Sequence, residues 1–105
     1  MTEIAFKKIH KHSYNNRLEI EASDRCGCFH CLEIFSPDII NDKNWYSTTE
    51  PPIEQTLFCP KCGIDSVIGS ASGYELNSEL LNKLRKYFFN TEYTRIPVVI
   101  NDALN

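Results

Sequence analysis

Long apolar runs and targeting signals are missing from this sequence of 105 residues. No stretch approaches the ~20 apolar residues that a membrane-spanning helix needs. Residues 1–4 also lack the charged and then apolar order of a secretory signal. Because the length suits a single domain, we expect one domain over residues 1–105 that stays in the cytoplasm and does not enter a membrane.

Signatures of catalysis are missing as well. The sequence has no phosphate-binding loop, no Ser-His-Asp set and no conspicuous pair of carboxylates. Glu33 and Asp65 lie close to cysteines, but a single acid in that position is more typical of a surface or turn residue than of a general base. We therefore expect that the protein is not an enzyme.

Positive charge is scarce in the middle of the chain. The chain has 11 Lys and Arg against 14 Asp and Glu, a net charge of −3, and residues 32–79 hold eight of the acids but only two lysines. Non-specific binding to a nucleic-acid backbone requires clustered positive charge, so this balance favours a basic protein partner. Five acidic residues could face such a partner: Glu33, Asp38, Asp42, Glu50 and Glu54.

The small size of the domain makes a cross-link useful. A chain of this length buries only about two-thirds of the surface that its unfolded form exposes, so its core is marginal. Five cysteines are available for a cross-link. Because thiols stay reduced in the cytoplasm, a metal site is favoured over disulfides.

Four of the cysteines form two CxxC units, which we call the first knuckle (residues 28–31) and the second knuckle (residues 59–62). Two intervening residues allow a turn tight enough for both sulfurs to reach one ion at ~2.3 Å, and two such turns complete a tetrahedron. Gly63 suits the second turn, because the residue after the last cysteine often needs a positive φ. We predict one structural Zn²⁺ with four thiolate ligands: Cys28, Cys31, Cys59 and Cys62.

Other readings of the cysteines stay open at this point. Cys26 is either a buried thiol or an alternate ligand, and His30 and His12 are less favoured substitutes. A redox-active dithiol would need a cysteine at a helix start inside a βαβ unit. A catalytic zinc ion would need an open coordination position, which four sulfurs would fill.

Helices are predicted towards both ends of the chain. Apolar residues at helical spacing predict an amphipathic helix over 2–13. We interpret 17–22 as a second helix rather than a strand, with Asn16 as its cap and Glu19 placed as in a capping box. The strongest apolar pattern predicts a core helix over 77–89.

The segment before the second knuckle has turn-forming residues. Ser36 and the following proline suit the start of a short helix. Residues 41–52 contain Asn, Asp, Ser, Thr and two prolines, which predicts a loop. We expect Trp45 and Tyr46 to be docked on the core, the alternative being exposure to a partner.

Two β-prone runs, 55–58 and 66–69, flank the second knuckle. This arrangement predicts a hairpin with the knuckle at its tip. Residues 95–100 form either an edge strand or an extended tail. The predicted fold is a small α+β, zinc-ribbon-like domain with four parts: an N-terminal helical segment (1–25), the knuckles (26–69), a packed helix (77–89) and a tail (90–105).

Two motifs carry a resemblance to a known family. The first is CGCFxC at 26–31 and the second is CPxCGxDSVIG at 59–69. Over residues 8–89 the chain resembles a family of small bacterial cytoplasmic proteins that share these motifs. Shorter matching stretches are 12–17, 35–39, Trp45 and 86–89. The resemblance implies a zinc-ribbon-like module and carries no catalytic residues over, and the chain departs from the family in the 41–55 loop and after residue 90.

Three functions follow as hypotheses. The first is a non-catalytic protein-binding module, for example an inhibitor or immunity protein that covers the basic active site of a nuclease toxin. The second is a nucleic-acid-binding zinc ribbon. The third is a metal-dependent nuclease that uses His12 or His30. The residues available to the second hypothesis are Lys7, Lys8, Lys11, Arg17 and Arg25.

Overall fold

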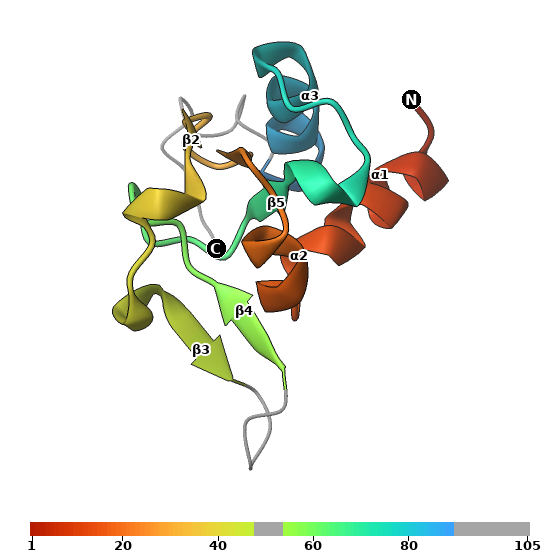
Figure 1. Cartoon of the computed structure of the whole chain (residues 1–105). Helices are drawn as coiled ribbons and strands as arrows, with labels where there is room; N and C mark the ends of the chain where they lie inside the picture. Colours follow the sequence, from red (N-terminus) through yellow and green to blue (C-terminus); the bar gives the residue numbers. More distant parts are fainter. Residues whose placement is uncertain (48–53, 90–105) are drawn as a thin grey trace, which may run out of the picture.

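The part of the chain that the structure describes has an α+β fold with two small antiparallel sheets and three α-helices (Figure 1). The computed structural model describes residues 1–47 and 54–89. The helices are α1 (Glu3–His10), α2 (Arg17–Glu21) and α3 (Ser78–Phe89). The strands are β1 (Cys26–Cys28), β2 (Ile34–Phe35), β3 (Trp45–Ser47), β4 (Gln55–Leu57) and β5 (Val67–Gly69). Single 3₁₀ turns are η1 (Lys11–Ser13), η2 (Pro37–Ile39), η3 (Asp42–Asn44) and η4 (Ser70–Ser72).

The predicted helices are present, with one change in shape. The pattern over 2–13 forms α1, which then tightens into η1, and Thr2 accepts a hydrogen bond from Ala5 N at its start. The helix expected over 77–89 is α3, and the Asn77 side chain accepts a hydrogen bond from Leu80 N. The short helix expected at Ser36 is the single turn η2.

The strand pairing differs from the prediction. The runs 55–58 and 66–69 do not form a hairpin, because β4 pairs with β3 and β5 pairs with β1. The loop expected over 41–52 contains a 3₁₀ turn and the strand β3. In the first case β5 pairs with the distant strand β1, and in the second case β4 pairs with the neighbouring strand β3. Local composition alone does not reveal either pairing.

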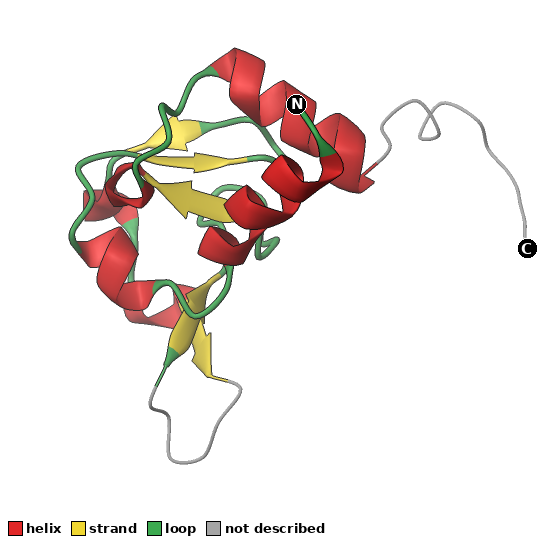
Figure 2. Cartoon of the chain, turned by 90° about the vertical axis from the view of Figure 1, so that its right-hand side faces the viewer, coloured by secondary structure: helices red, strands yellow, loops and turns green. Residues whose placement is uncertain are grey.

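The three-stranded sheet has the order β2-β1-β5, so β1 is central. Cys28 lies opposite Val67, and Gly27 lies opposite Ile68. The helices α1 and α3 pack on one side of this sheet, while the β3–β4 ribbon extends away from it (Figure 2). The first CxxC unit therefore begins inside the central strand of this sheet, whose three residues are all buried.

Two clusters of buried apolar residues fill the fold. One surrounds the sulfur-rich region and the other lies between the sheet and α1 and α3. The first contains Ile20, Cys26, Cys28, Phe35, Leu57, Cys59 and Val67, and the second contains Ile9, Phe29, Ile68, Leu76, Leu81 and Leu84.

The aromatic residues of β3 are docked, as expected. Trp45 packs partly buried against the first cluster, and the guanidinium carbon of Arg17 lies 4.8 Å from its ring centre. Tyr46 stacks on Phe58 with ring centres 4.2 Å apart, and its hydroxyl donates to Asp65. These contacts join the β3–β4 ribbon to the rest of the structure.

Asn16 is the N-cap residue of α2, as predicted, but its side chain makes no capping hydrogen bond. Its side chain donates to the carbonyls of His12 (2.9 Å) and Val67 (3.0 Å), and it accepts from Leu57 N at 3.2 Å. The residue is 3% exposed, so these bonds satisfy buried backbone groups of η1, β5 and β4. Glu19 likewise pairs with His12 rather than completing a capping box.

Residues 95–100, with the rest of the tail, lie outside the described residues. The same holds for 48–53 within the loop. Within the described part of the chain, no helix is long and apolar enough to cross a membrane.

Candidate metal centre

The first knuckle is a tight turn that continues from β1. Leu32 N donates to the Cys28 carbonyl (2.8 Å), and Cys28 N donates to the Glu33 carbonyl (3.0 Å). The Cys28 sulfur accepts from His30 N (3.3 Å) and Cys31 N (3.5 Å). The backbone thus places both cysteines of the unit on the inside of the turn and directs amide N–H groups at one of the sulfurs.

The second knuckle repeats this pattern after β4. Gly63 N donates to the Cys59 carbonyl (2.8 Å), and Cys59 N donates to the Ile64 carbonyl (2.9 Å). The Cys59 sulfur accepts from Lys61 N at 3.3 Å. Gly63 has φ of 83°, as the sequence predicted for the residue after Cys62.

The four sulfurs of the two knuckles converge. The Sγ atoms of Cys28 and Cys62 are 3.7 Å apart, those of Cys31 and Cys59 are 3.8 Å apart, and all four lie within 4.8 Å of one another. A tetrahedron with metal–sulfur bonds of ~2.3 Å has edges of about 3.8 Å. The arrangement is therefore compatible with a bound metal ion in its centre.

The cluster is protected on one side and accessible on the other. Cys28 and Cys59 are 0% and 2% exposed and belong to a buried apolar cluster, whereas Cys31 and Cys62 are half-buried. An ion held here would be reached from the side of Cys31 and Cys62.

Crowding of the sulfurs separates their pKa values. A hydrogen bond from the Cys59 thiol, together with the Ser66 hydroxyl and backbone N–H groups, lowers the pKa of Cys28 to about 4. The same contact with Cys28, together with burial, raises the pKa of Cys59, and burial raises the pKa of Cys62 to about 11. Without a cation these shifts favour a thiolate at Cys28 beside protonated Cys59 and Cys62, and a divalent cation would replace those two protons.

Cys26 lies outside the four-sulfur cluster. It is fully buried in the apolar cluster around Ile20 and Phe35, and burial raises its pKa to about 12. A thiol in this state behaves as a small apolar side chain. Of the two roles left open for Cys26, the geometry favours the buried thiol.

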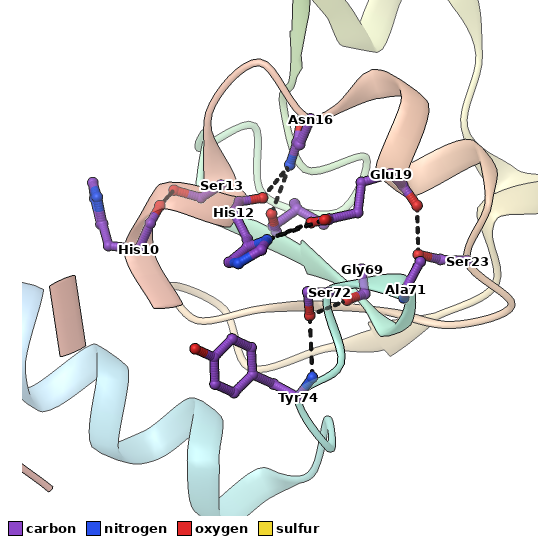
Figure 3. A network of polar contacts seen from close by, with 11 residues as sticks. His10, His12, Ser13, Asn16, Glu19, Ser23, Gly69, Ala71, Ser72 and Tyr74 are labelled. Carbon is purple, nitrogen blue, oxygen red and sulfur yellow. Dashed lines mark hydrogen bonds and ion pairs between the residues drawn. The ribbon is translucent and has the colours of Figure 1, made fainter. Parts of the chain in front are cut away.

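Neither candidate histidine is part of the cluster. Figure 3 shows the His12 ring directed at Glu19, whose carboxylate oxygens lie 2.8 and 3.1 Å from Nδ1. The His30 ring packs edge-on against Phe89, with centres 4.8 Å apart. Both side chains are engaged elsewhere in the fold.

The two acids near the knuckles have structural contacts. The Glu33 carbonyl closes the first turn, and the Asp65 carboxylate accepts from the Tyr46 hydroxyl at 3.0 Å. Both residues are exposed. These contacts agree with the expectation that each is a turn or surface residue.

Two features of the site went unnoticed in the sequence. Leu32 has φ of 68°, so the first knuckle places an ordinary side chain in the left-handed region where the second has Gly63. Aligning the two knuckles would have indicated this conformation. Ser66 is buried with its hydroxyl 3.2 Å from the Cys28 sulfur. It lies within the second motif, but that motif does not indicate a contact with the first knuckle.

The acidic residues that could face a basic partner lie on the surface where the structure describes them. Of the acids, Glu33, Asp38, Asp42 and Glu54 are exposed, and Glu50 lies outside the described residues.

Several of the basic residues are engaged within the protein. Lys7 and Arg17 form ion pairs with Glu3 and Glu21, at 3.0 and 2.8 Å, and Arg25 donates to a backbone carbonyl just before α3. These intramolecular contacts therefore reduce the positive charge that Lys7, Arg17 and Arg25 could offer to a ligand.

Comparisons with models of protein families, with curated proteins and with solved structures find no match. The resemblance to small bacterial cytoplasmic proteins therefore stays a prediction. Function has to follow from the residues of this chain.

Proposed function

We propose that the four cysteines hold one structural Zn²⁺ and that the fold built around it acts as a non-catalytic protein-binding module. The observation that carries the proposal is the pair of sulfur–sulfur distances, 3.7 and 3.8 Å, between the two knuckles. Four thiolates would complete the coordination of the ion, and a complete set is characteristic of structural rather than catalytic zinc.

Zinc is the metal that suits this ligand set. Four sulfurs in a tetrahedron bind Zn²⁺ or iron, while carboxylate and carbonyl sites suit Mg²⁺ and Ca²⁺. Backbone N–H groups directed at the Cys28 and Cys59 sulfurs would stabilise the thiolates around such an ion.

The ion would supply a cross-link that the small core lacks. It would join the strand β1 to the end of β4, segments that no strand pairing connects directly. Structural zinc contributes on the order of 10 kcal/mol in small peptides, comparable to the total stability of a domain. The metal would therefore maintain the fold.

A metal-binding assay with single Cys→Ser variants tests the centre. We expect one equivalent of zinc in wild-type protein, and loss of at least tenfold in affinity when any of Cys28, Cys31, Cys59 or Cys62 is changed. Cys26→Ser is the matched control, because it alters a buried cysteine outside the cluster and should retain the full equivalent. Retention of zinc by two or more of the four variants would refute the assignment.

The surface chemistry favours a basic protein as the partner. The chain is acidic overall, with a charge of −3, and Glu33, Asp38 and Asp42 are exposed. An acidic surface speeds association with a basic one and suppresses wrong partners. A specific form of this role is an inhibitor or immunity protein for a nuclease toxin with a basic active site.

Binding to nucleic acid is the second candidate, and the internal pairing of Lys7, Arg17 and Arg25 weighs against it. Affinity purification from the native cell, followed by titration at 50 and 300 mM salt, separates the two. A protein partner whose affinity falls with salt is expected. A low-salt gel shift with DNA or RNA, without any protein partner, would favour the alternative.

A further inference from the structure

Ser66 occupies a fixed position beside the metal centre. The residue directly precedes β5 and is 1% exposed. Its carbonyl accepts from Phe29 N at 2.9 Å, and the next residue, Val67, lies opposite Cys28 in the sheet. The backbone of Ser66 is therefore held against the first knuckle on the buried side of the cluster.

The Ser66 hydroxyl is directed at a sulfur. Its Oγ lies 3.2 Å from the Cys28 Sγ. A thiolate has no proton to give, so in a metal-bound centre the hydroxyl has to be the donor. The Cys28 sulfur also accepts hydrogen bonds from the backbone amides of His30 and Cys31. The Ser66 hydroxyl would thus be a third donor to this sulfur, and it comes from a side chain.

We infer that Ser66 is a positioning residue for the metal centre, whose hydroxyl donates to the Cys28 thiolate and fixes that sulfur in its ligating orientation. This inference rests on the proposed four-thiolate centre. The Ser66 hydrogen bond would give the four ligands unequal surroundings. The buried Cys28 would have a side-chain donor, whereas Cys31 and Cys62 lie on the accessible side.

Loss of this hydroxyl should weaken the metal centre in two measurable ways. Removing an outer hydrogen bond to a ligand typically lowers metal affinity by on the order of tenfold or more. It also leaves the sulfur more electron-rich, which moves the sulfur-to-metal charge-transfer band of a Co²⁺-substituted protein to longer wavelength.

The test is a Co²⁺ titration of the full chain, followed by displacement with Zn²⁺, for wild type, Ser66→Thr and Ser66→Val. Threonine and valine have nearly the same shape, so steric effects on the fold are shared and only the hydroxyl differs. We expect Ser66→Val to bind at least tenfold more weakly than Ser66→Thr and to have its charge-transfer band at longer wavelength.

Ser13→Ala provides a control for burial alone. Ser13 is 3% exposed and donates to the His10 carbonyl at 2.7 Å, away from the sulfurs. This variant should lose stability but keep the wild-type affinity and band position. A purely structural role of Ser66 would make the Ser66→Val variant behave in the same way.

The outcomes separate the two proposals. If wild type gives no tetrahedral Co²⁺–thiolate spectrum, the proposed zinc centre fails. If wild type gives that spectrum while the Thr and Val variants agree within twofold in affinity and share one band position, the inference about Ser66 is wrong and the centre stands.

A measurement on the unchanged chain covers the case in which the variants do not fold. In the ¹¹³Cd-loaded protein, a slowly exchanging Ser66 hydroxyl proton coupled to the metal through the Cys28 sulfur supports the inference. Absence of that coupling, with the coupling to the His30 amide visible, contradicts it.

Discussion

The two knuckles have the same internal hydrogen bonds but different surroundings. In the first, Cys28 belongs to the central strand β1, and Phe29 is 1% exposed and packs against Phe88. In the second, the positions after Cys59 are half-buried or exposed, and Gly63 has no neighbouring atoms where a side chain would be. Packing can hold the first turn, whereas the second would depend more on the proposed metal ion.

The residue after each knuckle illustrates this difference. Leu32 adopts a left-handed φ of 68° and packs partly buried against the cluster around Phe29. That contact offsets the cost of a conformation that ordinary residues avoid. Gly63 needs no such contact, because glycine adopts positive φ without a steric penalty.

Metal removal should have the largest effect on stability and should affect the second knuckle before the first. A chelator that strips the proposed zinc ion should remove on the order of 10 kcal/mol of stabilisation, so we expect the metal-free chain to unfold at 25 °C. With limiting chelator, the amides of Cys59 and of residues 61–63 should exchange with solvent before those of 26–29. Circular dichroism and hydrogen exchange measure the two effects, and a metal-free protein that keeps its thermal midpoint would contradict them.

Truncation at the second position of each knuckle should have unequal effects. Phe29→Ala removes a buried ring and should cost about 3–5 kcal/mol. Pro60→Ala changes a half-buried residue and should cost about 1 kcal/mol or less. Urea unfolding of the zinc-loaded variants measures both, and equal losses would show that the two turns depend on packing alike.

Asn16 links β5, the partner strand of β1, to β4, the strand that precedes the second knuckle. Its amide bonds to the Val67 carbonyl in β5 and to Leu57 N in β4, so Asn16→Ala leaves buried backbone groups unpaired. The expected loss is about 2–3 kcal/mol. Asn77→Ala, which removes one half-buried helix cap, is the control and should lose about 1 kcal/mol. A smaller loss for Asn16→Ala than for the control would contradict this role.

The smallest expected effect is at the turn residue of the second knuckle. Gly63→Ala meets no atoms but must hold φ of 83°, which costs about 1 kcal/mol. Gly73→Ala, with φ of 91° and equally open space, should lose similar stability. Only the Gly63 variant should release zinc faster to a chelator. Equal release rates for the two variants would show that the turn at Gly63 does not affect metal binding.

Local patterns predicted the helices and the composition of the candidate site. The apolar spacing of residues 80–88 gives α3, and the two CxxC units indicate which four sulfurs converge. Both signals act over a few residues, where sequence spacing and spatial proximity agree.

Contacts between distant segments could not be predicted in this way. The pairing of β1 with β5, the bonds of Asn16 to Leu57 and Val67, and the contact of Ser66 with Cys28 each join residues that are 38 or more positions apart. A β-prone run does not specify its partner strand, and an asparagine before a helix suits a cap as well as a bridge. Tertiary structure decides between these possibilities.

The most direct measurement is zinc K-edge X-ray absorption on protein purified without added metal, together with metal analysis of the same sample. One zinc per chain with four sulfur neighbours at ~2.3 Å is expected. A chain without zinc, or zinc with nitrogen or oxygen ligands, would contradict the four-thiolate centre that joins the two knuckles.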